Sequence, residues 1–183
     1  MKFSFDSTIA AISTAPGPGA ISVIRISGSE SEKILQKIFS PRDLIERENL
    51  IAEVPLFKSH SAKHGYIYDP STKDIIDEIV LVFYKNPMSF TGEDLVEISC
   101  HGGPVICHEI LALLIREGAT LARRGEFTER AFLNGKMDLT QAESILDIIQ
   151  AKTSRQGRAA VSALTGRLGK PSKETRDELI PLL

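Results

Sequence analysis

The sequence predicts an α+β fold, a mixed sheet with helices, followed by part of an all-α helical domain. Three observations predict it. Short apolar runs bounded by glycine and proline fill the first 118 residues, as is typical of strands. Helix-capping signals occur between some of these runs. Beyond residue 118 the sequence has helical periodicity. We therefore expect an α+β domain over residues 1–118 and the start of a helical domain over residues 119–183.

Composition narrows the class of protein. The chain has 183 residues, of which 42% are apolar and 25% charged, the balance of a soluble globular protein. Its net charge of −2 excludes a global basic field that would attract nucleic acid. Two cysteines argue against a disulfide-stapled secreted scaffold. The N-terminus does not have the pattern of a signal peptide, and no apolar run approaches membrane-spanning length. We expect a cytoplasmic protein without a membrane segment.

Two strands and a helix are expected first. The strands cover residues 8–13 and 21–27, and TAPGPG between them specifies a turn because proline and glycine are dense there. Side chains alternate along a strand, so Arg25 shares a face with Ile21 and Val23. It is a charged residue in an otherwise apolar segment. Ser29 is expected to cap a helix that ends near Phe39.

The next part predicts a hairpin after an irregular segment. Residues 40–63 show no clean period and are expected to form a loop, with room for a strand at 50–57. Strands at 64–68 and 77–84 follow, joined by a turn at Asp69-Pro70.

A strand at residues 95–100 carries one carboxylate in its middle. Alternation puts Glu97 on the same face as Leu95 and Ser99. Gly102-Gly103-Pro104 comes next, and proline at a first helical position predicts a helix that runs to about Arg116.

The rest of the chain predicts helices. Thr128 is expected to cap a short helix that Asn134-Gly135 ends, which leaves Lys136 on a tight turn. Thr140 and Glu143 form a capping-box pattern that opens a long helix. We expect Gly169 and Pro171 to end it, and Ser172 to begin another helix.

The sequence disfavours a zinc site, a Cys–His protease and a phosphate-binding loop. Cys100-His101 and Cys107-His108 match none of the usual zinc patterns, so no metal site is expected. A Cys–His protease would need a marked nucleophile and an orienting partner, which the sequence does not show. The phosphate-loop pattern GxxxxGK[ST] is absent as well.

Two roles, one structural and one in ligand binding, are open for three charged residues: Arg25, Glu97 and Lys136. Arg25 and Glu97 could form a cross-strand ion pair. They could instead face a pocket, where the carboxylate accepts hydrogen bonds from a planar amide–amidine edge and arginine binds a carboxylate or carbonyl. Lys136 could be a solvated lysine on a turn.

Three long motifs carry a family resemblance. TAPGPGAISVIRISG, SFTGEDLVEISCHGGP and RRGEFTERAFLNGKMDLTQAESILDII, in this order, resemble the beginning of the MnmE (TrmE) family of tRNA-modification GTPases. The similarity covers almost the whole chain. Arg124 departs from the pattern, in which proline precedes Gly-Glu-Phe.

The resemblance implies a fold and a function. In this family an N-terminal domain similar to the folate-binding domains of aminomethyltransferases precedes a helical domain that contains a GTPase insertion. The implied cofactor is a tetrahydrofolate derivative, 5-formyl- or 5,10-methylene-tetrahydrofolate, used as the one-carbon donor for a tRNA wobble uridine. GTP, Mg²⁺ and K⁺ are expected only in the GTPase domain, whose motifs are absent here. Implied partners are a second copy in a homodimer, the flavoprotein MnmG and tRNA.

The same resemblance implies the site residues. Arg25, Glu97 and Lys136 match the family's folate contacts, and Glu97 is expected to hold the pterin edge. No catalytic residue is assigned. One alternative is a dimerisation or docking scaffold for MnmG or tRNA without a ligand of its own. A free-standing aminomethyltransferase is another, but it needs a catalytic acid that the sequence does not reveal. The docking alternative draws on basic residues of the helical part: Lys152, Arg155, Arg158, Arg167, Lys170 and Lys173.

Overall fold

The structure is a computed structural model that describes residues 7–42 and 58–165. The chain forms two compact units, Met1–Phe127 and Thr128–Leu183. Each is described by itself below. The predicted domain division at residue 118 stays a prediction. None of the described helices is long and apolar enough to span a membrane.

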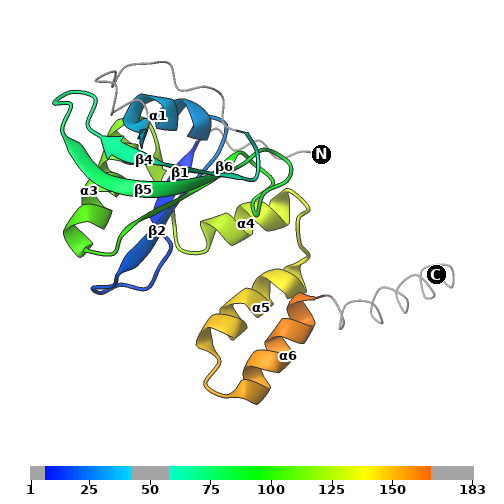
Figure 1. Ribbon diagram of the computed structural model, residues 1–183. Helices are drawn as coiled ribbons and strands as arrows, with labels where there is room; N and C mark the ends of the chain where they lie inside the picture. Colours follow the sequence, from blue (N-terminus) through cyan, green and yellow to red (C-terminus); the bar gives the residue numbers. More distant parts are fainter. Residues whose placement is uncertain (1–6, 43–57, 166–183) are drawn as a thin grey trace, which may run out of the picture. The chain divides into compact units, whose positions relative to one another are not determined.

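The described part of the first unit contains a seven-stranded sheet (Figure 1). Its order is β3-β4-β5-β6-β2-β1-β7. β1 and β7 are parallel and the other neighbours are antiparallel, so the predicted mixed sheet is confirmed. The strands are β1 (Ile9–Ile12), β2 (Ile21–Ser27), β3 (Phe39–Pro41), β4 (Ser61–Tyr68), β5 (Ile75–Tyr84), β6 (Leu95–His101) and β7 (Thr120–Leu121).

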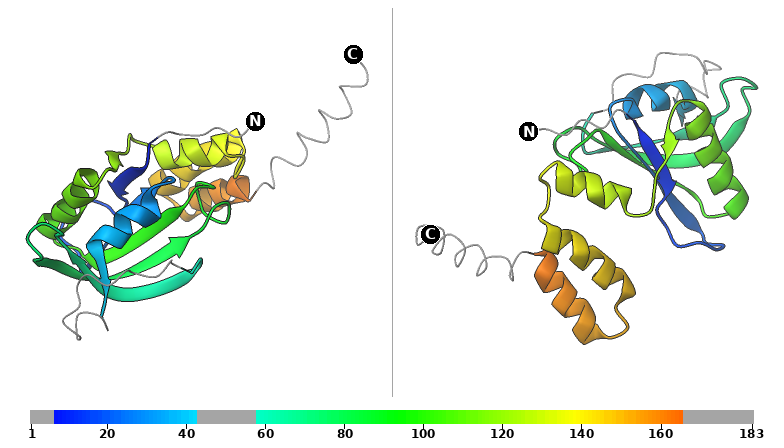
Figure 2. Two further views of the ribbon diagram at one scale, coloured as in Figure 1. Left: turned by 90° about the horizontal axis from the view of Figure 1, so that it is seen from above. Right: turned by 180° about the vertical axis from the view of Figure 1, so that it is seen from behind.

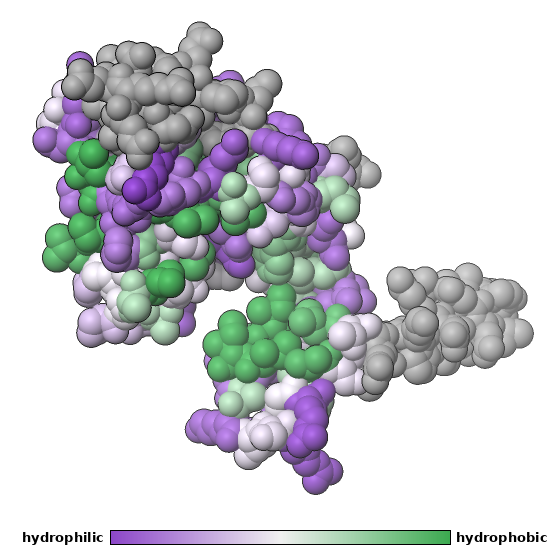
Figure 3. Space-filling view, viewed as in Figure 1, coloured by the Kyte–Doolittle hydropathy of each residue, from purple (hydrophilic) through white to green (hydrophobic). Residues whose placement is uncertain are grey.

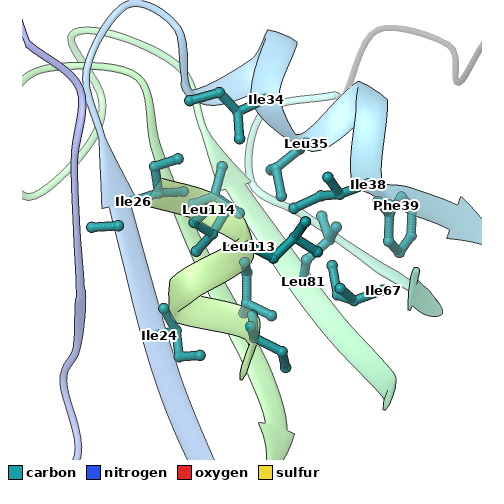
Figure 4. Packing of buried hydrophobic residues seen from close by; sticks show 14 of the residues in the cluster. Ile24, Ile26, Ile34, Leu35, Ile38, Phe39, Ile67, Leu81, Leu113 and Leu114 are labelled. Atoms are coloured by element: carbon teal, nitrogen blue, oxygen red, sulfur yellow. The ribbon is translucent and has the colours of Figure 1, made fainter. Parts of the chain in front are cut away.

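Two helices, α1 (Ser31–Ile38) and α3 (Pro104–Arg116), cover one face of this sheet (Figure 2). Their apolar residues and every second residue of the central strands form one buried cluster. Figure 4 shows Leu35 of α1 and Leu113 of α3 converging on Ile26 of β2 and Leu81 of β5. Burial of this apolar surface is the main stabilising contribution to the unit.

The opposite side chains of the central strands form a second surface, which we call the half-exposed face. Each of its members is partly buried, and strand register makes them neighbours. It consists of Val23, Arg25, Val82, Glu97 and Ser99. Charged residues are tolerated there because water still reaches them.

Several sequence predictions for this unit are confirmed. Strand β2 has the predicted limits, and α3 begins at Pro104 and ends at Arg116 as expected. Strands β1, β4, β5 and β6 also form at the predicted places, although β4 starts three residues earlier and β5 two residues earlier. Pairing between β4 and β5 explains their extra length, because each strand supplies hydrogen-bond partners to the other.

Two local predictions for this unit were wrong, and one strand was not predicted. Residues 40 and 41 were expected to be loop but belong to β3. This strand forms because Phe39 is fully buried and pairs with Ile67 of β4. Ser29 does not cap α1. Instead the hydroxyl of Thr8 accepts a hydrogen bond from the backbone N–H of Glu30. Strand β7 was not predicted, since two residues carry no periodicity and only pairing with β1 makes them a strand.

The described helices beyond residue 125 are α4 (Glu126–Leu133), α5 (Leu139–Gln150) and α6 (Ser154–Leu164). The predicted long helix is therefore two helices, which pack on each other as a hairpin. Thr153 interrupts the pattern because its side chain caps α6 by accepting from the backbone N–H of Gln156.

Two predicted helix starts were displaced. α4 begins at Glu126, before the proposed cap Thr128. The capping box of α5 is made by Asp138 and Gln141, two residues before the predicted pair Thr140–Glu143. An aspartate competes well with threonine as an N-cap, so the earlier start is favoured.

The hairpin leaves apolar side chains on its surface (Figure 3). Leu146 is 57% exposed and Ile149 is 74% exposed. The predicted strand at 50–57, the helix end at Gly169 and Pro171 and the helix start at Ser172 lie outside the described residues.

Candidate functional site

Arg25 and Glu97 meet in the middle of the sheet. They are directly opposite each other in the register of β2 and β6, and Val82 of β5 is opposite Glu97 on its other side. The two residues are thus held by four neighbouring strands, β5, β6, β2 and β1. Such a central position fixes their backbones firmly, while the half-exposed face leaves the ends of their side chains accessible.

The Arg25 guanidinium binds one oxygen of the Glu97 carboxylate. Its Nε donates to Oε1 at 2.8 Å, and its Nη2 lies 2.7 Å from the same oxygen. The other oxygen, Oε2, accepts from the hydroxyl of Tyr84 at 3.4 Å. The Arg25 side chain is 32% exposed and that of Glu97 is 26% exposed. The cross-strand ion pair that the sequence offered as one interpretation is present.

An aromatic ring covers Arg25. Its guanidinium carbon lies 5.5 Å from the centre of the Phe90 ring, within the range of a cation–π interaction. Phe90 belongs to the loop that joins β5 to β6. Ser27 of β2 holds this loop, because its hydroxyl is hydrogen-bonded to Thr91 and donates to Glu93, each at 2.7 Å.

Asp94 connects the two ends of this loop. Its carboxylate accepts from the Lys85 ammonium at 2.8 Å and from the backbone N–H of Asn86 at 2.9 Å. The hydrogen bond with Asp94 raises the pKa of Lys85 above its ordinary value. Ser27 thus ties the loop to β2 and Asp94 ties its two ends together, which holds Phe90 beside Arg25.

This arrangement can bind a ligand that offers hydrogen-bond donors. A carboxylate has about four lone-pair positions. Arg25 directs its Nε and Nη2 to Oε1, and Oε2 has one 3.4 Å hydrogen bond from Tyr84, so Oε2 keeps acceptor capacity. The aromatic and guanidinium surfaces beside it suit a flat ligand.

Lys136 is placed by the end of α4. Gly135 has a φ of +71°, which glycine adopts without strain, and its N–H donates to the carbonyl of Phe132. The backbone N–H of Lys136 donates to the carbonyl of Ala131, completing a Schellman motif. The predicted end of this helix at Asn134-Gly135 is confirmed. Lys136 is exposed and belongs to the second unit, whereas Arg25 and Glu97 belong to the first.

Sequence reasoning missed Tyr84 and Phe90. The alternation of β5 was available as a signal, because Leu81 and Phe83 face the core and Tyr84 must face the other way. Phe90 belongs to the motif SFTGEDLVEISCHGGP, but a loop residue has no periodicity that would place it over Arg25.

The two Cys-His pairs have structural partners. The thiol of Cys100 donates to the carbonyl of Ser22, and that of Cys107 to the carbonyl of His101. Burial raises the pKa of Cys100 to about 12, which disfavours the thiolate that a nucleophile or metal ligand needs. His101 is hydrogen-bonded to Asp77 through Nδ1 at 2.6 Å, and this bond raises its pKa.

Comparison with known proteins identifies the family. Residues 8–136 match the family described as the GTP-binding protein TrmE N-terminus. The chain belongs to this family. All three predicted site residues lie inside the matched segment.

Relatives of the TrmE N-terminus family extend the match. The chain is 45% identical to the tRNA modification GTPase MnmE of Thermoanaerobacter pseudethanolicus, over 96% of the chain and 37% of that protein. It is 48% identical to the protein of that name from Streptococcus sanguinis, over 96% of the chain and 36% of the relative. The figures for Acetivibrio thermocellus are 44%, 97% and 37%. The chain thus spans a little over a third of these relatives.

Proposed function

We propose that this chain is the folate-binding and dimer-forming module of a GTPase that modifies the tRNA wobble uridine. Its ligand is 5-formyl- or 5,10-methylene-tetrahydrofolate, the one-carbon donor. The observation that carries the proposal is Glu97, a carboxylate at the centre of a sheet that remains partly exposed and keeps acceptor capacity at Oε2. The relatives' name, tRNA modification GTPase, supports the wider role.

The chemistry of the pair fits a pterin. A pterin edge carries a ring N–H beside an exocyclic amine, and an ionised carboxylate accepts from both. For two parallel hydrogen bonds, one of the Arg25 donors has to leave Oε1. That donor then becomes available to an oxygen of the ligand. Phe90 supplies an apolar surface next to the pair.

Lys136 is proposed as a further cationic contact. Its ammonium would bind carbonyl, formyl or glutamate oxygens of the folate, as would the freed donor of Arg25. The Schellman turn supports this role, because it fixes the backbone of an exposed lysine.

The wider assignments follow from the same proposal. The module forms a homodimer, works with the flavoprotein MnmG on tRNA, and is cytoplasmic. GTP, Mg²⁺ and K⁺ belong to a GTPase domain outside this sequence. One-carbon transfer is then the chemistry of the bound folate, while this chain binds and orients it.

Calorimetric titration of the 183-residue chain with 5-formyl-tetrahydrofolate tests the proposal. We expect saturable binding that Glu97→Gln weakens strongly. Glu78→Gln is the matched control, because Glu78 is also a partly exposed carboxylate on a neighbouring strand, with its Oε1 2.8 Å from Nε2 of His64 and 3.5 Å from Nη1 of Arg42. It should leave the affinity unchanged. Absence of binding at millimolar ligand would overturn the folate proposal.

A docking scaffold without its own ligand is the second candidate. Exposed apolar side chains on the sheet favour it: Ile21 is 68% exposed and Val80 is 41% exposed. Three basic residues of the docking hypothesis lie on the described helical hairpin and are exposed: Lys152, Arg155 and Arg158. A scaffold would bind MnmG or tRNA but not folate. Its binding to tRNA would weaken steeply with salt, and a flat response would exclude the tRNA version.

A further inference from the structure

Tyr84 is a side chain to which the function proposed above gives no role. It is the last residue of β5 and lies two positions after Val82, which pairs with Glu97. Alternation therefore brings Tyr84 to the half-exposed face, diagonally across from Glu97. Diagonal neighbours in an antiparallel pair are within reach of a long aromatic side chain. The Tyr84 hydroxyl accordingly reaches the Glu97 carboxylate at 3.4 Å.

The two oxygens of Glu97 have different neighbours. Nε and Nη2 of Arg25 both lie at Oε1, and among the described residues the hydrogen bond at Oε2 comes from Tyr84. Without the hydroxyl, the carboxylate could rotate about the axis defined by its single anchored oxygen. With the hydroxyl present, both oxygens of the carboxylate are hydrogen-bonded, and these two contacts fix the orientation of its plane.

The ring of Tyr84 is itself supported. His60 contacts it edge to face, with ring centres 5.3 Å apart and planes at 88°. The backbone N–H of His60 donates to the carbonyl of Phe83, so this contact is tied to the preceding residue of β5. Partial burial, and then the nearby charge and hydrogen bond of Glu97, raise the pKa of Tyr84. The phenol is therefore protonated at neutral pH and donates a hydrogen bond to the carboxylate.

We propose that Tyr84 is a positioning residue of the folate site, whose hydroxyl orients the Glu97 carboxylate for the pterin edge. This inference rests on the proposed folate function. Tyr84 acts through Oε2, the oxygen that Arg25 does not contact, and Oε2 keeps an acceptor position for a ligand donor beside the hydroxyl. Its contribution to affinity is thus indirect and depends on the presence of Glu97.

A double-mutant cycle on the full 183-residue chain tests this dependence. Affinity for 5-formyl-tetrahydrofolate is measured for the wild type, Tyr84→Phe, Glu97→Gln and the double variant. The hydroxyl affects affinity only indirectly, through one hydrogen bond of 3.4 Å, so we expect Tyr84→Phe to weaken binding by the value of an ordinary hydrogen bond, roughly three- to tenfold. In the Glu97→Gln background the same change should have little effect, because the partner is already altered.

The control is Tyr66→Phe, which removes a hydroxyl from partly buried Tyr66 on β4. It should not change the affinity. Equal weakening by Tyr84→Phe in both backgrounds, or no weakening in either, overturns the positioning role while leaving the folate site intact. A wild type that binds no folate overturns both proposals.

A spectroscopic measurement provides a second test that does not need the ligand. Ultraviolet absorbance follows tyrosine ionisation in this chain of three tyrosines. Because the charge of Glu97 raises the pKa of Tyr84, Glu97→Gln should lower it, and Glu78→Gln should not. An unchanged titration in Glu97→Gln contradicts the contact on which the proposal depends.

Discussion

The carboxylates of Glu97 and Asp77 lie in neighbouring strands of one sheet but differ in how much of their acceptor capacity is filled by donors of the protein. Asp77 accepts at Oδ2 from the backbone N–H of His101, and at Oδ1 from the His101 ring and from the backbone N–H of Glu78. Its side chain is 8% exposed. The Glu97 side chain is 26% exposed and holds one long hydrogen bond at Oε2.

This difference separates a structural carboxylate from a binding one. A buried acceptor whose donors are all in the protein stabilises the fold, and losing it leaves those donors unsatisfied. A partly exposed acceptor with spare capacity adds little to stability but can receive a ligand. Replacing each carboxylate by its amide makes the same chemical change at both places, and the expected results are opposite.

The largest effect is expected for Glu97→Gln. The new amine would face the donors of the pterin, and each polar group left unpaired costs about 1–3 kcal/mol. Folate affinity should therefore fall roughly tenfold to a thousandfold. The thermal midpoint should change less than in Asp77→Asn, because water still reaches the Arg25–Glu97 pair and screens it. Calorimetric titration and thermal unfolding on the same variant measure both quantities. A lowered midpoint with unchanged affinity would mean that Glu97 serves only the ion pair.

Asp77→Asn should show the reverse. One acceptor oxygen becomes an amine, so one of the three donors loses its partner, at a cost of about 1–3 kcal/mol in the free energy of unfolding. Folate affinity of the folded protein should stay unchanged. Urea unfolding gives the first quantity and titration the second. A loss of affinity comparable to that of Glu97→Gln would erase the distinction between the two carboxylates.

A smaller effect is expected for Phe90→Leu. Leucine keeps an apolar side chain but removes the ring beside Arg25, and an exposed cation–π interaction contributes about 0.5–1 kcal/mol. Folate affinity should fall about two- to fivefold. Met88→Leu in the same loop is the matched control, because Met88 is 65% exposed. Equal affinities for the two variants would show that the ring does not support the site.

The smallest effect concerns pH and the Asp77–His101 pair. The pair raises the pKa of His101, so its stabilisation is fully present below the unfolded-state pKa of about 6.5. It is lost as the pH rises through the higher folded-state pKa. The difference in urea midpoint between wild type and His101→Gln should accordingly shrink as the pH rises from 6 to 9. A difference that grows over this range contradicts the sign of the linkage.

How much of the site the sequence predicts depends on the kind of residue. Arg25 and Glu97 stood out because a charge in an apolar strand violates the alternation around it. Their ion pair was one of two stated interpretations, and strand register makes it real. Register is a tertiary property, so the sequence alone did not place the two residues opposite each other.

Residues without a periodic context were harder to predict. Tyr84 reaches Glu97 diagonally across two strands, and Phe90 reaches Arg25 from a loop held by Ser27. The residue before α1, Glu30, donates its backbone N–H to Thr8, 22 residues away in the chain. Each of these contacts joins distant segments, and local propensity carries no information about such contacts.

Local patterns by themselves determined the α+β class, the limits of β2 and α3, and the glycine turn before Lys136. These features depend on side-chain alternation, proline at a helix start and glycine with a positive φ, all of which act over a few residues. Tertiary structure decided β3, β7, the break between α5 and α6, and the partners of Glu97. Short strands and half-buried charges gain their stability from neighbours far away in sequence, so only the folded chain could specify them.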